Sequence, residues 1–428
     1  MNAEIVSIGN ELLIGDTVNT NASWIGQTLT EEGLDVKGIH TIGDELEIVK
    51  DTIWRSMEKH DLVVCTGGLG PTHDDVTKKA LQQLFDAEMV VEESVLRFVK
   101  KMFRKRNIPF TKSNYHQAEV LDNAEVLFNT QGTAPGLWFE EFESFLAVLP
   151  GVPCEMKHLM GEKVIPRLRE KLSHREFRRS RYIVTAGIGE STLTDEVIGD
   201  LDEFLQNGTT VAYLPSPYGV RIRITNSGRS REQIAKHIDP VADHIYQKAG
   251  PLIIGEGKEL TLSEVLGNEL RKRDLTIATA ESCTGGHLSD RLTDIPGSSD
   301  YVVGGILAYA NRIKTKELFV SELALQEHGA VSKPIALEMA EHVAEKFKTD
   351  IGISTTGIAG PGGGTEEKPV GTVWIGFWSR EQHFALRALF TNDRLINKER
   401  TVAVALETVR RTLLGIETMP YGIEPEWA

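Results

Sequence analysis

The chain has 428 residues, of which 40% are hydrophobic and 25% are charged, a balance that is ordinary for a globular protein of several domains. Its formal net charge of −15 opposes general nucleic-acid binding, which depends on neutralising phosphates with Lys and Arg. No stretch approaches the roughly 20 apolar residues of a membrane span, and no signal peptide opens the chain. Three widely separated cysteines predict neither a disulfide framework nor a zinc site, so we expect a cytoplasmic protein.

Residues 1–170 alternate strand and helix patterns. Apolar runs at 5–9 and 61–67 predict core strands, and helical spacing predicts helices over 20–29 and 45–60. Such alternation predicts an α/β domain with a mostly parallel sheet that is covered by helices. Ligands of such sheets bind beyond the carboxyl ends of the strands.

A glycine-rich loop, residues 66–77, follows the second of these strands and opens a helix. Its glycines, with a second loop at 129–136, would let backbone N–H groups approach a phosphate; the candidates for binding are Gly67, Gly68, Gly70, Thr72, Gly132 and Thr133. Acids at the same edge would need a divalent metal between themselves and a phosphate, and the candidate ligands are Glu11, Asp44, Asp74 and Asp75. A plain glycine turn with Asp74 or Asp75 as a helix cap is the alternative.

Residues 178–250 have a different pattern and predict a compact α+β domain. The expected elements are strands at 182–185, 212–214 and 220–225 and helices at 192–204 and 231–249. No cluster of catalytic residue types falls there. Residues 250–257 are predicted to be a linker.

The strand and helix alternation returns over residues 258–418, which predicts a second α/β domain. We expect strands at 275–280, 301–309, 351–355 and 370–377, and helices at 334–347 and 395–414.

Residues 281–286 lie where the strand at 275–280 turns into a helix. Ser282 would then lie close to the free N–H groups of a helix N-terminus, which can stabilise an oxyanion. An ordinary Ser/Thr helix cap explains the same residues. Cys283 competes with Ser282 as the nucleophile, since a helix N-terminus also lowers the pKa of a thiol.

A serine nucleophile needs a base, and no histidine falls in the motifs around Ser282. Lys314 follows the strand at 301–309, and a desolvated lysine can accept the serine proton. Tyr309 could relay that proton. A surface lysine and a strand-end tyrosine are the alternatives.

A third strand leads into a glycine-rich loop at 354–365 that suits a phosphate or an oxyanion. Arg394 and Arg400 could clamp a phosphate, or could be surface ion-pair partners. A flexible loop is the alternative for residues 354–365.

The motifs at 9–13, 67–75 and 132–136 resemble the molybdopterin-binding-like domain of the CinA family. The resemblance implies hydrolysis of ADP-ribose that depends on potassium and on a divalent metal of the Mg, Mn or Co type. Asn10 stands where the family motif often has Asp, which weakens a catalytic role for position 10 and leaves Glu11 in place.

The motifs at 281–286, 309–314, 329–332 and 355–363 resemble the CinA C-terminal domain, a nicotinamide-nucleotide amidohydrolase. This implies conversion of nicotinamide mononucleotide (NMN) to nicotinic acid mononucleotide and ammonia without a cofactor. Ser282 would be the nucleophile, Lys314 with Tyr309 its base, and the N–H groups after Ser282 and around Thr356 would hold the oxyanion. The substrate-binding candidates are Thr284, Gly285, Gly286, Asn311, Gly360, Gly362, Gly363, Arg394 and Arg400.

The resemblance makes the middle domain KH-like and implies a homodimer. Residues 187–190 lack the spacing of a Gly-x-x-Gly nucleic-acid loop, so we do not expect RNA binding. Two other readings stay open: a pterin- or nucleotide-binding scaffold without chemistry, and a DNA-associated competence factor.

Overall fold

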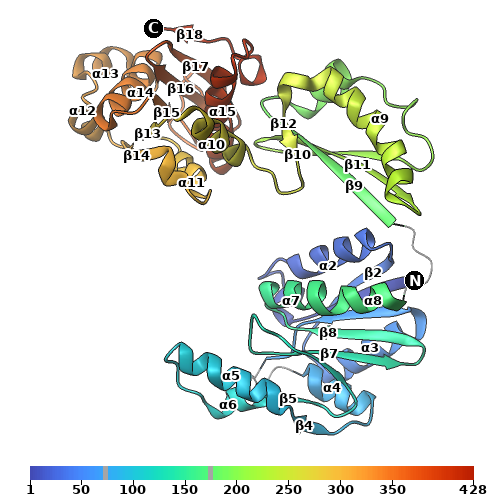
Figure 1. Cartoon of the computed structure of the whole chain (residues 1–428). Coiled ribbons are helices and arrows are strands. Elements are labelled where there is room, and N and C mark those ends of the chain that lie inside the picture. Colours follow the sequence, from blue (N-terminus) through green and yellow to red (C-terminus); the bar gives the residue numbers. More distant parts are fainter. Residues whose placement is uncertain (71–75, 172–176) are drawn as a thin grey trace. The chain divides into compact units, whose positions relative to one another are not determined.

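A computed structural model describes residues 1–70, 76–171 and 177–428 (Figure 1). The chain forms two compact units. The first comprises Met1–Arg179 with Ser227–Arg231, and the second comprises Ser180–Asn226 with Glu232–Ala428.

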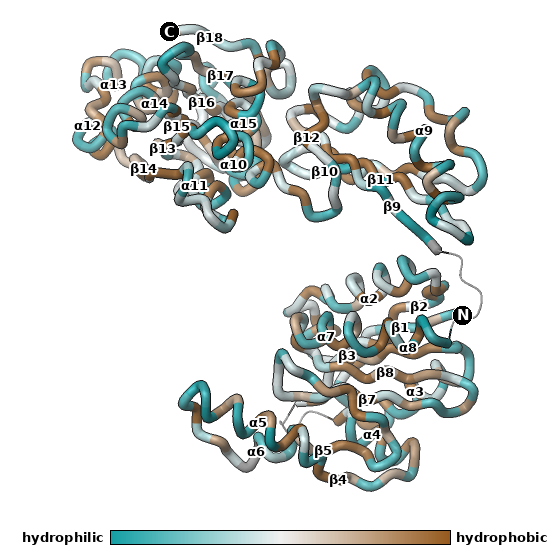
Figure 2. Tube along the Cα trace, viewed as in Figure 1, coloured by the Kyte–Doolittle hydropathy of each residue, from teal (hydrophilic) through white to brown (hydrophobic). Residues whose placement is uncertain are grey.

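The first unit is built on a six-stranded sheet of order β2-β1-β3-β8-β7-β6. β1 (Asn2–Ile8), β2 (Asp35–Ile42), β3 (Leu62–Thr66) and β8 (Ser144–Leu149) are parallel, and β7 (Gly136–Glu141) and β6 (Glu125–Leu127) add antiparallel pairs. Figure 2 shows the apolar character of these strands, whose two faces carry separate hydrophobic clusters. The carboxyl ends of the four parallel strands therefore share one edge.

Helices cover both faces of this sheet. One cluster contains residues of α2 (Thr20–Glu31), α7 (Pro153–Leu159) and α8 (Ile165–Lys171), and the other contains residues of α3 (Leu46–Lys59) and α4 (Thr77–Leu84). The remaining elements are α1 (Asn10–Leu13), β4 (Met89–Val91), α5 (Glu93–Lys105), α6 (Lys112–Tyr115) and β5 (Glu119–Leu121).

The second unit begins with a four-stranded sheet of order β10-β11-β9-β12, packed against α9 (Arg231–Ala249). Its strands are β9 (Phe177–Thr185), β10 (Thr210–Ser216), β11 (Gly219–Gly228) and β12 (Ile253–Glu256). The linker predicted at 250–257 is wrong, because β12 lies within it and pairs with β9. The helix predicted at 192–204 ends at Ile198, since Gly199 has a φ of 72°.

The C-terminal part of this unit has a six-stranded sheet of order β14-β13-β15-β16-β17-β18. β13 (Ile277–Glu281) pairs in parallel with β14 (Val302–Leu307) and β15 (Ile351–Gly357), and β16 (Thr372–Ser379), β17 (His383–Leu389) and β18 (Glu426–Trp427) continue antiparallel. The α/β class is confirmed; β13 and β14 precede the Ser282 and Lys314 segments, and β15 contains Thr356 near its end.

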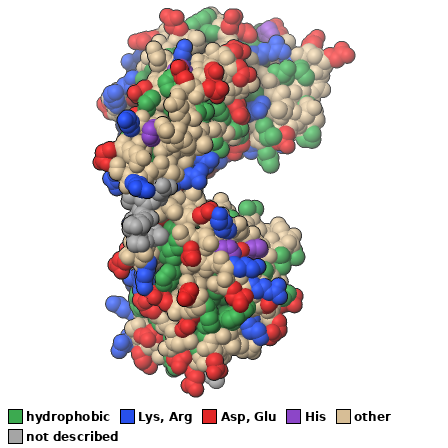
Figure 3. All heavy atoms as spheres, turned by 90° about the vertical axis from the view of Figure 1, so that its right-hand side faces the viewer, with side chains coloured by type: hydrophobic (Ala, Val, Ile, Leu, Met, Phe, Trp, Pro, Cys, Tyr) green, Lys and Arg blue, Asp and Glu red, His purple; other side chains and the backbone are tan. Residues whose placement is uncertain are grey.

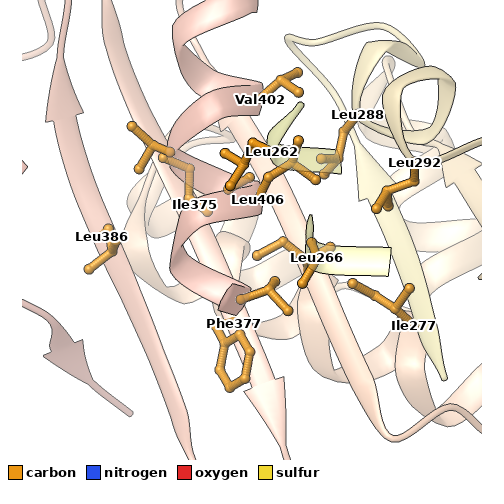
Figure 4. Packing of buried hydrophobic residues seen from close by; sticks show 14 of the residues in the cluster. Leu262, Leu266, Ile277, Leu288, Leu292, Ile375, Phe377, Leu386, Val402 and Leu406 are labelled. Carbon is orange, nitrogen blue, oxygen red and sulfur yellow. The ribbon is translucent and has the colours of Figure 1, made fainter. Parts of the chain in front are cut away.

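One face of this sheet packs on α10 (Leu262–Arg273), α11 (His287–Thr293) and α15 (Arg394–Leu414). Figure 4 shows side chains from these helices meeting Ile277, Ile375 and Phe377 of the sheet. The other face carries α14 (Lys333–Phe347), where a Cβ on Gly352 would lie 1.9 Å from the carbonyl oxygen of Ala340. α12 (Asn311–Leu318) and α13 (Glu322–His328) complete the domain.

A buried cluster of charges ties the KH-like part to the C-terminal part. Glu407 accepts hydrogen bonds from Arg410 and Arg411, and all three side chains are at most 2% exposed. Arg410 also donates to the carbonyl of Pro251, and Arg411 to the carbonyl of Ala186. The second unit is therefore held together by polar contacts as well as by apolar packing.

Acidic and basic side chains are interspersed on the face seen in Figure 3, without a continuous basic patch on that face. Among the described residues, no helix is both long and apolar enough to cross a membrane.

Candidate active site

The ends of three parallel strands bring the candidate catalytic segments together. Glu281, the last residue of β13, pairs with Leu307 of β14 on one side and with Thr355 of β15 on the other. The residues that follow, Ser282 after β13 and Ala308 after β14, therefore lie at one edge of the sheet.

Ser282 and Lys314 are in direct contact at this edge. Lys314 Nζ lies 2.9 Å from Ser282 Oγ and donates a 2.6 Å hydrogen bond to the carbonyl of Ala308. Lys314 lies on the first turns of α12 and is 1% exposed, and Ser282 is 9% exposed. The sequence-based pairing of a serine with a lysine is thus present as a hydrogen-bonded pair.

Burial changes the acid–base chemistry of this lysine. Desolvation lowers the pKa of Lys314 to about 8, because a buried ammonium loses its hydration and no carboxylate is among the causes of its shift. A substantial fraction of Lys314 is then neutral near pH 7 to 8. A neutral amine beside a serine hydroxyl can act as a general base.

The Glu281 carboxylate binds the N–H groups at the start of α11, which the sequence predicted to stabilise an oxyanion. The buried carboxylate accepts hydrogen bonds from the backbone N–H groups of Gly286, Leu288 and Ser289, at 2.8–3.0 Å. These three N–H groups cannot hold a reacting oxyanion at the same time. Among the described residues, the backbone N–H groups of Cys283 and Thr284 make no hydrogen bond to another residue, so these two donors of the turn are left for an oxyanion.

The environment of Cys283 opposes a role as nucleophile. The thiol is buried, and desolvation raises its pKa to about 12. The charge of Glu281 also raises this pKa, and the charge of Lys314 and the hydrogen bond with Thr355, which lower it, do not offset the desolvation. Cys283 therefore stays a neutral thiol at physiological pH.

The hydroxyl of Tyr309 points to an arginine. Tyr309 is 58% exposed, and its hydroxyl accepts a 2.9 Å hydrogen bond from Arg394, which also donates to the carbonyl of Gly360. Lys314 reaches only the backbone carbonyl of Tyr309, at 3.5 Å. Tyr309 and Arg394 thus form a polar rim beside the glycine loop.

The structure distinguishes the two arginines that are candidates for binding a phosphate. Arg394 begins α15 and contacts the loop, whereas Arg400 lies further along the helix, where its charge acts on Tyr421. Only Arg394 is brought to the 360–364 loop by the contacts above.

The remaining candidates of this domain lie around the same edge. The buried hydroxyl of Thr356 donates to the carbonyl of Ala330, which brings the 329–332 motif to the site. Thr284 bonds to Glu281 and lies 2.7 Å from Thr355 Oγ1. The exposed candidates are Asn311 at the start of α12 and, in the loop after β15, Gly362 and Gly363; Gly285 and Gly286 form the turn before α11.

Lys398 lies near the Ser282 turn but was not among the site residues predicted from the sequence. Its Nζ would lie 3.6 Å from a Cβ on Gly285, so α15 delivers a second cation to the Ser282 turn. The spacing Arg394 to Lys398 is one helical turn and could have indicated it.

The first unit has a separate cleft of about 440 Å³ at the carboxyl edge of its parallel strands. Its lining includes the candidates Glu11, Asp44, Gly67, Gly68, Gly70 and Thr133. Gly67 has a φ of 109° and its Cβ would lie 2.1 Å from the carbonyl oxygen of Ile8, so only glycine fits this turn.

Two of the four predicted metal ligands, Asp74 and Asp75, lie outside the described residues, as does Thr72. Asp44 Oδ2 accepts a hydrogen bond from the Asn10 backbone N–H. Over the described ranges, no group of three or more His, Cys, Asp and Glu side chains could hold a metal ion. The metal site stays a prediction.

Glu155 is a second residue that sequence reasoning missed. It lines the cleft from the first turn of α7, accepts a 2.6 Å hydrogen bond from Asn129, and has its pKa raised by burial. Gly132 lies against it, since a Cβ there would meet the Glu155 carboxylate at about 2 Å. The sequence feature that could have indicated Glu155 is an acidic residue in the first turn of the helix that follows β8.

Comparison with known families matches three consecutive segments of the chain. They are the CinA C-terminal domain over residues 259–413, the "Probable molybdopterin binding domain" over 4–170 and the "Damage-inducible protein CinA KH domain" over 180–255. A CinA-like protein of Salinibacter ruber is 46% identical over 414 residues, which cover 96% of this chain and all of that protein. The chain belongs to the CinA family.

Two further CinA proteins are similar to this chain, one along almost its whole length and one over a part of it. A CinA-like protein of Chloroherpeton thalassium is 43% identical, with 96% of this chain and 99% of that protein covered. Among solved structures, a CinA protein of Thermoplasma acidophilum is 36% identical and covers 38% of this chain and 97% of that chain, with a TM-score of 0.36. The three family matches give the chain the CinA architecture of a molybdopterin-binding-type domain, a KH domain and a CinA C-terminal domain.

Proposed function

We propose that the C-terminal domain hydrolyses the amide of NMN to nicotinic acid mononucleotide and ammonia. The observation that carries the proposal is the buried Lys314–Ser282 pair, with 2.9 Å between Nζ and Oγ and a lysine pKa of about 8. This combination provides a base that is partly neutral at physiological pH next to a hydroxyl nucleophile.

The reaction follows from these positions. Neutral Lys314 takes the Ser282 proton as Oγ bonds to the nicotinamide carbonyl carbon, and the N–H groups of Cys283 and Thr284 hold the oxyanion. Lys314 returns the proton to the amide nitrogen, the C–N bond breaks and ammonia leaves. Water then attacks the ester, gives its proton to Lys314 and releases the carboxylic acid and Ser282. Arg394, at the glycine loop, binds the 5′-phosphate.

The test measures ammonia and nicotinic acid mononucleotide from NMN with the full chain, without added metal. Ser282→Ala should lower turnover at least 1000-fold, because no other nucleophile is paired with Lys314. Cys283→Ser, which changes the neighbouring thiol, should retain activity within tenfold. Normal turnover by Ser282→Ala would refute the assignment.

We propose as a second activity that the first unit hydrolyses the pyrophosphate of ADP-ribose. The 440 Å³ cleft supports this, since the Gly67–Gly68 turn exposes backbone at its wall and the acids Glu11, Asp44 and Glu155 line it. A divalent cation would supply charge neutralisation, with Glu11 and Asp44 as its described ligands and potassium as a further requirement. Glu155, with its raised pKa, is placed to accept a proton from water.

The two activities should be separable in the intact chain. Asp44→Asn should lower release of AMP and ribose 5-phosphate at least 100-fold and leave NMN turnover unchanged, and Ser282→Ala should do the reverse. No release with Mg²⁺, Mn²⁺ or Co²⁺ and potassium would leave the cleft with a binding role, as the scaffold alternative expects. Sedimentation and cell fractionation test the homodimer and the cytoplasmic location that belong to this proposal.

A further inference from the structure

A cavity of about 330 Å³ lies in the second unit, between the four-stranded KH-like sheet and the helices α10 and α11. Its walls are mainly apolar side chains, including Val184, Leu214, Val220, Ile254, Leu262 and Ile295. Neither Ser282 nor Lys314 lines it. Its size and apolar walls are those of a site for a small organic molecule.

One cation in this cavity lacks a full set of acceptors. Arg221, on β11, donates through Nη2 to the carbonyl of Leu260 at 3.2 Å. Its Nε is buried and has no hydrogen-bond partner among the described residues. Nη1 of Arg221 also has no hydrogen-bond partner among the described residues, and it is not buried, so an anionic group in the cavity would be stabilised by accepting from Nη1.

The other arginine of the cavity is already satisfied. Arg291, on α11, donates to the hydroxyl of Tyr218 at 3.1 Å and to Asp294 at 3.0 Å. The cavity therefore offers one open cation, at Arg221, and the aromatic ring of Tyr218 beside apolar walls.

We propose that this cavity binds one small aromatic carboxylate. The carboxylate accepts hydrogen bonds from Arg221, and the ring lies between the apolar residues of the KH-like sheet and those of α10 and α11.

The walls are held in place before any ligand arrives. Arg411 binds the carbonyl of Ala186, just after β9, and Arg410 binds the carbonyl of Pro251, just before β12. β9 and β12 supply Val184 and Ile254 to the cavity. A preformed site loses less conformational entropy on binding, which favours affinity for a small ligand.

Isothermal titration of the full chain with 2-naphthoate tests the proposal. We expect one saturable site per chain, bound at least tenfold more weakly by Arg221→Ala, because a hydrogen bond to a charged group is lost. The neutral amide 2-naphthamide should bind at least tenfold more weakly than the carboxylate. Absence of saturable binding to the natural chain, or equal binding of acid and amide, would overturn the proposal.

Two further variants control for folding and location. Arg223→Ala removes an arginine two residues along β11 that does not line the cavity, so it should leave binding unchanged. Leu214→Trp, at a 39% exposed position of the lining, should block the cavity and abolish binding while the melting temperature is kept. Equal binding by Leu214→Trp and the natural chain would place the ligand elsewhere.

Discussion

At the residue scale, Lys314 combines two properties that rarely occur together: it is buried and it has no carboxylate partner among the described residues. Its contacts are Ser282 Oγ and two carbonyl oxygens. Carbonyl oxygens orient the amine without supplying the full negative charge that would hold the proton. The side chain is therefore placed for proton transfer rather than for charge pairing.

The pH dependence of NMN hydrolysis should follow this lysine. The base must be neutral, and desolvation lowers the pKa of Lys314 to about 8, so kcat/KM should fall about tenfold per pH unit below that value and level off above about pH 9. A pH profile of kcat/KM from 6 to 10 measures this. A rate that is flat through pH 8, or that falls as the pH rises through it, would contradict the role of Lys314.

Replacement of the base should stabilise the protein. A pKa that drops from 10.5 to about 8 corresponds to a cost on the order of 3 kcal/mol for the buried cation, offset in the variant by lost hydrogen bonds of about 1 kcal/mol. Lys314→Met should therefore raise the free energy of unfolding by about 2 kcal/mol at pH 7 and abolish turnover.

The destabilisation by the buried charge of Lys314 depends on pH. The penalty is fully present below pH 8 and disappears as the pH rises towards the unfolded-state pKa of about 10.4. The stability that Lys314→Met gains over the natural chain, measured by thermal unfolding, should be smaller at pH 10 than at pH 7. Lys316→Met, at an exposed position of the same helix, should change stability by less than about 0.5 kcal/mol. An equal gain from both variants would refute the explanation.

At the element scale, the turn between β13 and α11 depends on one carboxylate. Glu281 accepts from three backbone N–H groups and from the hydroxyls of Thr284 and Ser289. These bonds close the helix end and fix the turn that carries Ser282.

Glu281→Gln should weaken the turn and the activity together. An amide removes the charge and points N–H groups at N–H donors, which should lower the free energy of unfolding by about 3 kcal/mol. Urea unfolding measures this, together with NMN turnover, which should fall because Ser282 moves. Glu264→Gln, at an exposed first-turn position of α10, should cost less than about 0.5 kcal/mol. Unchanged stability of Glu281→Gln would show that the cap is dispensable.

The strand and helix pattern predicted β1, β3, α2 and α3 in the first domain and β13 to β16, α14 and α15 in the last, because buried strands and amphipathic helices leave clear periodicities. Shorter elements such as β4, β6 and β18 were not predicted. The pairing partner of Ser282 was also predictable, since parallel strands end at one edge. The prediction of a linker at 250–257 was wrong because a short edge strand such as β12 has only two apolar residues before a glycine. The burial of the Glu281 side chain could not be predicted from the sequence, because a charged residue at the end of a strand is expected to be exposed.

Other parts of the site depend on distances that no local pattern encodes. The bond between Arg394 and Tyr309 joins positions 85 residues apart, and the contact between Gly132 and Glu155 depends on how the loop at 129–136 packs against α7. The raised pKa of Cys283 likewise follows from tertiary burial rather than from its place near a helix.

At the scale of the whole molecule, the Glu407–Arg410–Arg411 cluster joins the KH-like part of the second unit to its C-terminal part. Arg411 alone donates to the carbonyl of Ala186, 225 residues away in the sequence, and to the carbonyls of Thr418 and Met419, which follow α15.

Arg411→Met should disrupt this unit more than an ordinary surface change. It leaves Glu407 with one partner and several buried carbonyls without donors, which should cost about 3–5 kcal/mol. Differential scanning calorimetry should show the transition of the second unit at a lower temperature. Faster amide exchange at residues 186–188 should accompany it. Arg400→Met, on an exposed turn of the same helix, is the control; equal melting temperatures for the two variants would contradict the prediction.

The occupied helix end of α11 has a consequence for how a nucleotide can approach. A helix N-terminus near a nucleophile would normally attract phosphate as readily as a developing oxyanion, and a mononucleotide could then bind in either direction. Glu281 makes that end unattractive to anions, so the negatively charged tail of the proposed substrate is left with the glycine loop and the cations of α15, Arg394 and Lys398. In the proposed hydrolysis of NMN, this polarity would favour the orientation in which the uncharged amide, and not the phosphate, faces Ser282.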